Sequence, residues 1–211
     1  MKVIEPSFKF EEELDAKKIM DKIEKAGRTC YKSEDNIQEG SAERMIRMLI
    51  KKGHESVLEH QYVTVRIICD RGVTHELVRH RIASYSQEST RYCNYTGDKF
   101  GNELTFIKPC FWNTDSENDK KNMKIWEDTM SEIEKAYFAM IEAGAKPEQA
   151  RTILPNSLKT EIITTMNLRQ WRHFFKLRCD KAAHPQMREI ATKMFNGFKE
   201  VLPVFFEDIE F

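Results

Sequence analysis

The order of apolar and polar positions along the chain predicts a mixture of strands and helices. Residues 61–70 alternate apolar with more polar side chains, which is the period of two expected for a strand with one buried face. Residues 158–167 also resemble a strand, and shorter strands are predicted at residues 1–5 and 103–109. Residues 82–102 are polar and lack an apolar period over most of their length, so we expect a long, functional loop there.

Apolar residues three or four positions apart predict the helices. The longest stripe runs from Trp126 to Ile141 and is closed by Gly144. Other helices are predicted from Leu14 to Gly27, from Ser41 to Gly53, over residues 73–81, from Pro147, over residues 168–180 behind an Asn167 cap, and from Pro185 through Phe198. The chain shows no repeat and no linker, so the pattern indicates a single mixed α+β domain over residues 1–211.

Length and composition indicate a folded, soluble protein. A chain of 211 residues with 40% hydrophobic and 10% aromatic residues can bury a core without disulfides or metals, and it is not a disordered chain. The five cysteines are scattered and form no Cys-x-x-Cys pair, so we expect reduced thiols. Residues 1–15 are acidic rather than apolar, and no stretch approaches a membrane span, so a cytoplasmic location is expected.

Charge is balanced over the whole chain but segregated along it. With 34 basic and 34 acidic residues, the net charge of zero argues against broad nucleic-acid binding, which needs a basic surface. Residues 151–188 nevertheless hold eight basic and two acidic residues (+6), whereas residues 115–148 hold five basic and nine acidic residues (−4). The basic segment suits a small polyanion, and a solvated basic helix face is the alternative.

Two groups of basic residues point more specifically to anion chemistry. On a helix over residues 168–178, Arg178 falls between Trp171 and Phe174 on the aromatic stripe, where its five donors need a partner. A capping or helix-dipole role is the alternative for this arginine. In the run Arg79–Arg81, three adjacent cationic or titratable groups repel one another, and a shared anion such as phosphate would relieve the repulsion.

The stretch that begins with this run carries a recognisable motif. Residues 79–91 read RHRIASYSQESTR and fit Arg-His-Arg-x-x-Ser-x-x-x-x-Ser-x-Arg, which resembles the signature of flavin-dependent thymidylate synthases. The resemblance continues in HESVLEH at residues 54–60, ARTILP at residues 150–155 and NLRQWRHFFKLR at residues 167–178. It covers roughly residues 54–188.

The resemblance implies a homotetramer of α+β subunits, with helices packed on a mainly antiparallel sheet and active sites built where subunits meet. It implies methylation of dUMP at C5 to dTMP. The methylene would come from 5,10-methylenetetrahydrofolate, and the hydride from NADPH through FAD. We expect no metal and no nucleic-acid or membrane partner.

The same resemblance assigns residues to each ligand. Flavin binding is assigned to Ser56, Arg79, His80, Arg81, Gln87, Asn167, Leu168, Arg169 and His173. Binding of dUMP is assigned to Glu76, Leu77, Val78, Arg79, Gln87, Glu88, Ser89, Thr90, Arg91, Arg151 and Arg178. His54 would lie near flavin and folate. Arg178, placed at the pyrimidine, is the catalytic candidate, because a fixed cation stabilises the negative charge of an ionising N3–H.

Two positions depart from the family pattern. Ser86-Gln87 stands where the family shows Asn-Glu, and an acid follows as Glu88, so a role that needs a carboxylate at Gln87 is in question. Glu76 stands where glutamine is common, and its carboxylate would repel a nucleotide phosphate. We expect Glu76 to brace an arginine or to act through its backbone.

Other chemistries have less support. His54 and His60 are six positions apart, not the four that a helical zinc motif requires. Cys93 has no visible activating neighbour and is expected to be a packed or surface thiol. Two alternatives stay open: an FAD oxidase with another substrate, and a nucleotide- or RNA-binding protein without chemistry, which would stack bases on Trp171 and Tyr92.

Overall fold

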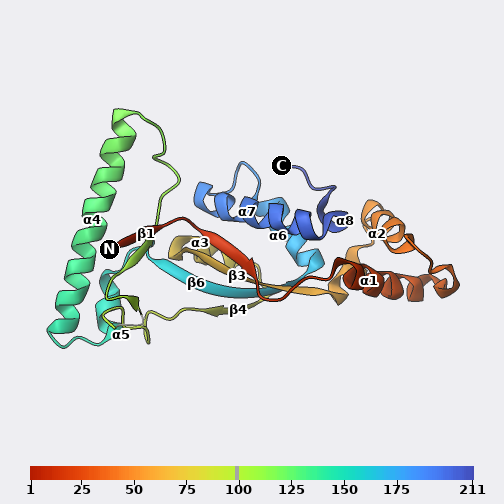
Figure 1. The fold of residues 1–211 in the computed structure, drawn as a ribbon, viewed down its shortest axis with the longest axis horizontal. Helices are drawn as coiled ribbons and strands as arrows, with labels where there is room; N and C mark the ends of the chain where they lie inside the picture. Colours follow the sequence, from red (N-terminus) through yellow and green to blue (C-terminus); the bar gives the residue numbers. More distant parts are fainter. Residues whose placement is uncertain (98–99) are drawn as a thin grey trace. The chain divides into compact units, whose positions relative to one another are not determined.

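The computed structural model describes residues 1–97 and 100–211, which form a mixed α+β fold (Figure 1). The strands are β1 (Lys2–Ile4), β2 (Ser7–Phe10), β3 (Tyr62–Asp70), β4 (Ser84–Gln87), β5 (Thr105–Ile107) and β6 (Lys159–Asn167). The α-helices are α1 (Ala16–Tyr31), α2 (Ser41–Lys51), α3 (Arg71–Leu77), α4 (Glu117–Glu142), α5 (Pro147–Ala150), α6 (Leu168–Arg178), α7 (Pro185–Val201) and α8 (Pro203–Phe206). Short 3-10 helices are η1 (Glu34–Asn36), η2 (Glu55–His60) and η4 (Arg151–Ile153). The predicted mixture of helices and strands is confirmed.

The strands form two sheets. The larger sheet has the order β2-β3-β6-β4, and the smaller pairs β1 with β5 in parallel. The hydroxyls of Thr64 in β3 and Thr165 in β6 are 3.0 Å apart, and the amide of Arg71 donates to the carbonyl of Leu158 at 3.2 Å. Residue numbers therefore rise along β3 while those of its partners in β6 fall, so these strands run antiparallel, as expected.

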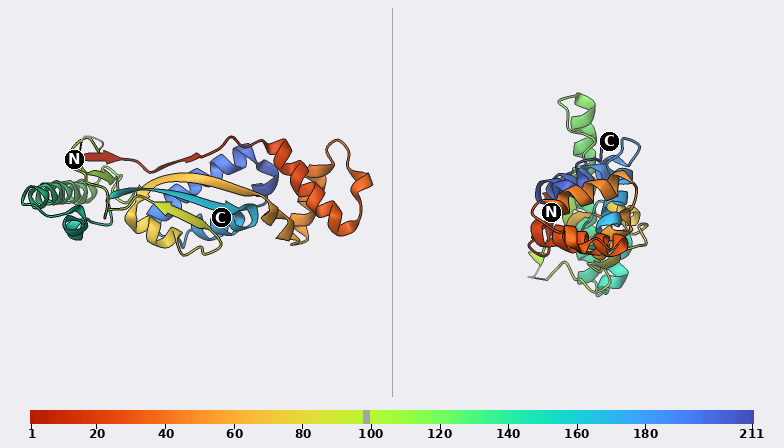
Figure 2. Two further views of the ribbon diagram at one scale, coloured as in Figure 1. Left: turned by 90° about the horizontal axis from the view of Figure 1, so that it is seen from below. Right: turned by 90° about the vertical axis from the view of Figure 1, so that its right-hand side faces the viewer.

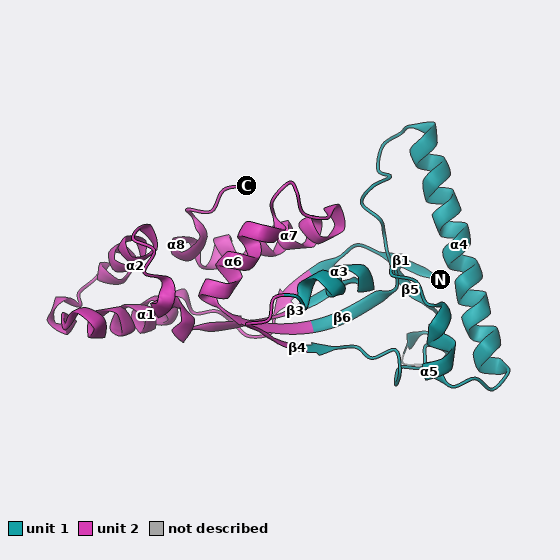
Figure 3. Ribbon diagram, turned by 180° about the vertical axis from the view of Figure 1, so that it is seen from behind, with its two compact units in different colours: residues 1–7, 67–79, 86–162 teal, residues 8–66, 80–85, 163–211 magenta. Residues whose placement is uncertain are grey.

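The chain divides into two compact units, which Figure 3 shows in different colours. Unit 1 comprises residues 1–7, 67–79 and 86–162, and unit 2 comprises residues 8–66, 80–85 and 163–211. Strands β2, β3, β4 and β6 each contribute residues to both units. That the whole chain forms a single domain stays a prediction. Over the described residues, no helix has the length and low charge needed to cross a bilayer.

The core of unit 1 packs on the long helix α4. Trp126, Met130 and Tyr137 are buried on one face of this helix, which confirms the predicted apolar stripe. The ring of Phe106 in β5 meets Trp126 edge to face, with the ring centroids 6.4 Å apart. Ser116 caps the helix by accepting a hydrogen bond from the amide of Asp119 at 3.1 Å, which satisfies one of its free N–H groups.

The core of unit 2 is an aromatic cluster shared by α6, α7 and α8. Trp171, Phe175, Phe198 and Phe206 are all fully buried. Phe198 lies 4.9 Å from Trp171 and 5.3 Å from Phe206 between ring centroids. The helix periods predicted over residues 168–180 and from Pro185 onward thus produce a packed core.

Helix α1 continues beyond Gly27, where the sequence analysis placed its end. A Cβ at Gly27 would lie only 2.7 Å from the terminal methyl carbon of Met45. The glycine therefore allows α1 and α2 to pack closely, and Figure 2 shows these two helices side by side. The helix ends at Tyr31, and Lys32 adopts the left-handed conformation with φ 49°.

The predicted loop over residues 82–102 contains strand β4, and this prediction was wrong there. The strand has no apolar period, and it forms because β6 pairs with it: the amide of Glu88 donates to the carbonyl of Glu161 at 2.8 Å. The sequence analysis also missed β2 and η2. The part of the loop prediction that concerns Asp98 and Lys99 lies outside the described residues.

Candidate active site

Much of the predicted site follows two turns, each of which leads from a strand directly into a helix. Asp70 ends β3 and accepts a hydrogen bond from the amide of Val73 at 2.8 Å, which starts α3 in unit 1. Asn167 ends β6 and accepts one from the amide of Gln170 at 2.8 Å, which starts α6 in unit 2. These caps fix where each helix begins. The predicted residues that follow the two turns are Glu76, Leu77, Val78 and Arg79, and Leu168, Arg169, His173 and Arg178.

Within unit 2, a hydrogen bond joins His80 to Arg178. The Nε of Arg178 donates to Nε2 of His80 at 3.0 Å. A guanidinium can only donate, so Nε2 of His80 is the acceptor of this hydrogen bond. The side-chain nitrogen of Gln170 lies 3.4 Å from the other ring nitrogen, Nδ1, and only 5% of His80 is exposed. A buried imidazole thus fixes the direction of the guanidinium.

The aromatic stripe of α6 supports this pair. The ring of Phe174 contacts His80 edge to face, with centroids 5.0 Å apart. Arg178 is partly buried at the end of the same helix and finds in His80 the acceptor that its position requires. Trp171 is fully buried and donates to the carbonyl of Val63, so the hypothesis that Trp171 stacks on bases is wrong.

An open cavity of about 480 Å³ lies beside α6 in unit 2. Its lining residues are Glu55, Glu59, Ile82, Asn167, Arg169, Gln170, His173 and Lys176, so it brings together three of the predicted flavin residues. The cations Arg169 and Lys176 suit phosphate oxygens, and the carboxylates Glu55 and Glu59 suit hydroxyl or N–H donors. These donors and acceptors fit FAD, which combines phosphates, hydroxyls and ring N–H groups, and the volume is typical of ligand pockets, roughly 300–1,000 Å³.

The predicted residues of unit 2 differ in their exposure and contacts. Arg169 pairs with Glu59 at 2.6 Å, and both side chains are about half exposed. Nδ1 of His54 lies 3.0 Å from the Tyr31 hydroxyl. Ser56 and Arg81 are exposed, whereas Leu168 is fully buried and offers no surface to a ligand within this chain.

In unit 1, Gln87 and Glu88 direct their side chains to different partners. The amide nitrogen of Gln87 donates to the hydroxyls of Thr74 and Thr160 at 3.1 and 3.2 Å. Glu88 accepts from Lys159 at 2.7 Å and from the Tyr95 hydroxyl at 2.8 Å. Burial raises the pKa of Tyr95, and the neighbouring Glu88 carboxylate raises it further. The Glu88 carboxylate is therefore occupied by contacts within unit 1.

The predicted nucleotide residues of unit 1 include exposed cations. Arg91 pairs with Glu148 of α5 at 3.3 Å, and its amide donates to the Ser89 hydroxyl at 3.3 Å. Arg151 is exposed at the start of η4, directly after α5. By contrast, Thr90 is 7% exposed. Leu77 is likewise buried in the core, and Val78 and Arg79 are exposed at the end of α3.

The sequence analysis missed Arg172, which is only 1% exposed. At 100° per residue it falls about 40° from Leu168, beside the apolar stripe of α6. That angle was the available signal of burial. Its partners are distant in sequence, so the pattern of α6 alone could not identify them.

Known proteins resemble the chain over most of its length. Residues 14–204 match the Thy1 family, described as thymidylate synthase complementing protein. The flavin-dependent thymidylate synthase of Geobacter sulfurreducens is 36% identical over 190 residues, which cover 87% of this chain and 78% of the relative. The flavin-dependent thymidylate synthase of Pyrococcus furiosus is 41% identical over 169 residues, which cover 80% of this chain and 67% of the relative.

The fold also resembles a solved structure. It is the crystal structure of the UMP/dUMP methylase PolB from Streptomyces cacaoi, bound with 5-Br dUMP. The two structures superpose with a TM-score of 0.78 over 98% of this chain and 96% of the PolB chain. At 24% identity this likeness concerns the fold, and it confirms the α+β class. The sequence relatives are enzymes, which argues against a binding protein without chemistry. The family match and these relatives show that the chain belongs to the flavin-dependent thymidylate synthase family.

Proposed function

We propose that this chain methylates C5 of dUMP and releases dTMP. The methylene of 5,10-methylenetetrahydrofolate and a hydride from NADPH together make the methyl group, and the C5 hydrogen leaves as a proton. The observation that carries the proposal is the 3.0 Å hydrogen bond between Arg178 and His80, because it links α6 to the Arg-His-Arg motif. The family relationship supports the flavin requirement.

The residues of the unit 2 cavity are proposed to hold FAD. Asn167, Arg169 and His173 line the cavity, and the cations of Arg169 and Lys176 are suited to the pyrophosphate. When bound, FAD would supply the hydride transfer that the protein's own side chains cannot perform. The further residues proposed for flavin binding are Ser56, Arg79, His80, Arg81, Gln87 and Leu168.

Arg178 is proposed to act on the pyrimidine. C5 of uracil is a weak nucleophile, and ionisation of N3–H spreads negative charge into the ring. A guanidinium that is partly buried and held by His80 stabilises this charge without having to reorient. The further residues proposed for dUMP binding are Glu76, Leu77, Val78, Arg79, Gln87, Glu88, Ser89, Thr90, Arg91 and Arg151, with His54 placed near flavin and folate.

The assembly is proposed to be a homotetramer in the cytoplasm, with sites shared between subunits. The sequence contains no Gly-x-Gly-x-x-Gly motif, so FAD binding of the Rossmann type is not expected. Mixing Arg79→Ala and Arg178→Ala subunits should restore part of the activity if these residues reach one site from different chains. A fully active monomer in sedimentation would contradict the shared sites.

The experiment that tests the reaction uses purified protein with FAD, NADPH, methylenetetrahydrofolate and dUMP. The proposal predicts dTMP as a product. An FAD oxidase with another substrate would instead oxidise NADPH without forming dTMP, and dUMP would not change the reoxidation of its flavin. Chromatographic measurement of dTMP together with NADPH absorbance separates the two enzymes.

A further inference from the structure

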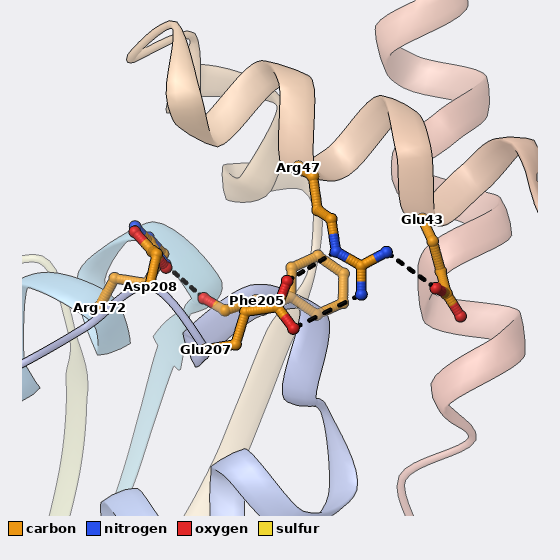
Figure 4. A network of polar contacts seen from close by, with 6 residues as sticks. All are labelled: Glu43, Arg47, Arg172, Phe205, Glu207 and Asp208. Atoms are coloured by element: carbon orange, nitrogen blue, oxygen red, sulfur yellow. Dashed lines mark hydrogen bonds and ion pairs between the residues drawn. The ribbon is translucent and has the colours of Figure 1, made fainter.

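Hydrogen bonds and ion pairs within unit 2 surround the guanidinium of the buried Arg172. Nε and Nη2 contact the Glu55 carboxylate, at the start of η2, at 3.2 and 3.1 Å. Nη1 and Nη2 each donate to the Asp208 carboxylate at 2.7 Å, and Nη1 also donates to the carbonyl of Phe205 (Figure 4). One guanidinium therefore joins α6, η2 and the segment Pro203–Asp208.

These contacts compensate the charge of the guanidinium in its buried position. Burial by itself lowers the pKa of Arg172, but the hydrogen bonds and charges of Asp208 and Glu55 outweigh it and raise the pKa. The hydrogen bond from Arg172 in turn holds the pKa of Asp208 below its usual value. Replacing a buried ion pair by apolar side chains of similar volume is often neutral for stability. Stability alone therefore does not account for the charged arrangement.

The cavity supplies that reason. Glu55 lines the cavity, and its side chain is 20% exposed, so its carboxylate lies between Arg172 and the open space. The same 3-10 helix carries Glu59, whose carboxylate pairs with Arg169 at 2.6 Å, and both residues line the cavity. Lys176, one turn after Arg172 on α6, also lines the cavity and further lowers the pKa of Asp208 by its charge. A shift of η2 along α6 would thus move two lining carboxylates at once.

We propose that Arg172, held by Asp208, is a positioning residue that anchors Glu55 against α6 and so sets the affinity of the cavity for FAD. The inference rests on the proposed function for the identity of the ligand. It assigns a functional role to the segment Pro203–Asp208, which contains no predicted site residue. Asp208 acts through Arg172 and Glu55 rather than by contact with the ligand.

The neighbouring residue Glu207 provides a matched control. Its carboxylate accepts from Nε of Arg47 in α2 at 2.6 Å, and Arg47 also pairs with Glu43 (Figure 4). The exposed fractions of the Glu207 and Asp208 side chains are nearly equal, 39% and 41%. None of Glu207, Arg47 and Glu43 lines the cavity. Glu207→Gln therefore removes a carboxylate of the same segment without touching the Arg172 contacts.

The experiment titrates flavin-free, full-length protein with FAD and follows the quenching of flavin fluorescence. Melting temperature is measured on the same samples. Asp208→Asn should weaken FAD binding roughly tenfold, or about 1.4 kcal/mol, whereas Glu207→Gln should stay within about twofold of the unmodified chain. Glu55→Gln tests the same contact from the cavity side and should weaken binding to a similar extent.

The double variant decides whether Asp208 acts through Glu55. In the Glu55→Gln background, Asp208→Asn should weaken FAD binding less than about twofold further, because the anchored carboxylate is already lost. Independent, multiplying effects would overturn the inference, and so would equal FAD affinities for Asp208→Asn and Glu207→Gln. An unmodified chain that takes up no FAD would instead overturn the proposed function, and this inference with it.

Discussion

The hydrogen bond between His80 and Arg178 allows a sharp prediction about substrate binding. His80→Ala removes the acceptor of the Arg178 Nε, whose distance to Nε2 is 3.0 Å. A hydrogen bond to a charged group contributes about 1.5–3 kcal/mol, so kcat/KM for dUMP should fall roughly 10- to 150-fold. His80→Gln should recover part of this loss, because the amide of glutamine reaches the position of Nε2 and still presents an acceptor.

A double-mutant cycle shows whether the loss passes through Arg178. Lysine keeps the charge but has no donor at the position of Nε, so Arg178→Lys should retain little activity. In that background His80→Ala should reduce kcat/KM by less than about threefold more. The steady-state assay of dTMP formation is accompanied by dUMP affinity and melting temperature, because His80 also packs on Phe174.

Two results would refute this reasoning. Multiplicative losses in the double variant would show that His80 acts independently of Arg178, for instance by contact with flavin alone. A less stable His80→Ala protein with normal turnover per folded molecule would reduce the contact to a structural one. Reduction of flavin by NADPH should survive Arg178→Ala if this arginine acts on the nucleotide alone.

Three further predictions concern other parts of the chain. Glu88→Gln should lower the free energy of unfolding by about 1–3 kcal/mol, since it leaves the charge of the partly buried Lys159 unpaired. The affinity for dUMP should nevertheless fall more in Gln87→Ala than in Glu88→Gln, and the opposite order in dUMP titrations would contradict this. Cys93→Ala should retain dTMP formation, whose loss with ligand binding preserved would indicate a thiol nucleophile. Because the pKa of Asp208 is lowered on folding, its stabilisation exists above about pH 4 and disappears on further acidification. The melting temperature of Asp208→Asn should therefore fall less steeply with acid than that of the unmodified chain, and parallel curves would contradict it.

The parts of the fold that the sequence predicted are those set by local pattern. The strand-like residues of β6, the cap at Asn167 and the aromatic spacing of α6 all lie in one stretch of chain. Strand β4 could not be predicted in this way, because it has no apolar period. Its backbone pairing with β6 makes it a strand. Gly27 indicates a helix end in the sequence pattern, because glycine commonly ends helices. Its actual role, close packing against Met45, is a tertiary contact that the local sequence does not show.

The site residues likewise fall into those that short-range spacing predicts and those that depend on contacts distant in sequence. The motif from Arg79 to Arg91 and the position of Arg178 could be predicted, since both follow from short-range spacing. The role of Arg172 could not, because its partners Glu55 and Asp208 are 117 and 36 positions away in sequence. Likewise, the sequence could not show that the Glu88 carboxylate is occupied by Lys159.

The dependence of dTMP formation on FAD tests the central claim most directly. Flavin-free protein is supplied with dUMP, NADPH and methylenetetrahydrofolate, and dTMP is measured with and without added FAD. The proposed function predicts dTMP only when FAD is present, with binding of FAD visible as flavin absorption on the protein. Equal dTMP formation without FAD, or no dTMP from protein that has bound FAD, would contradict it.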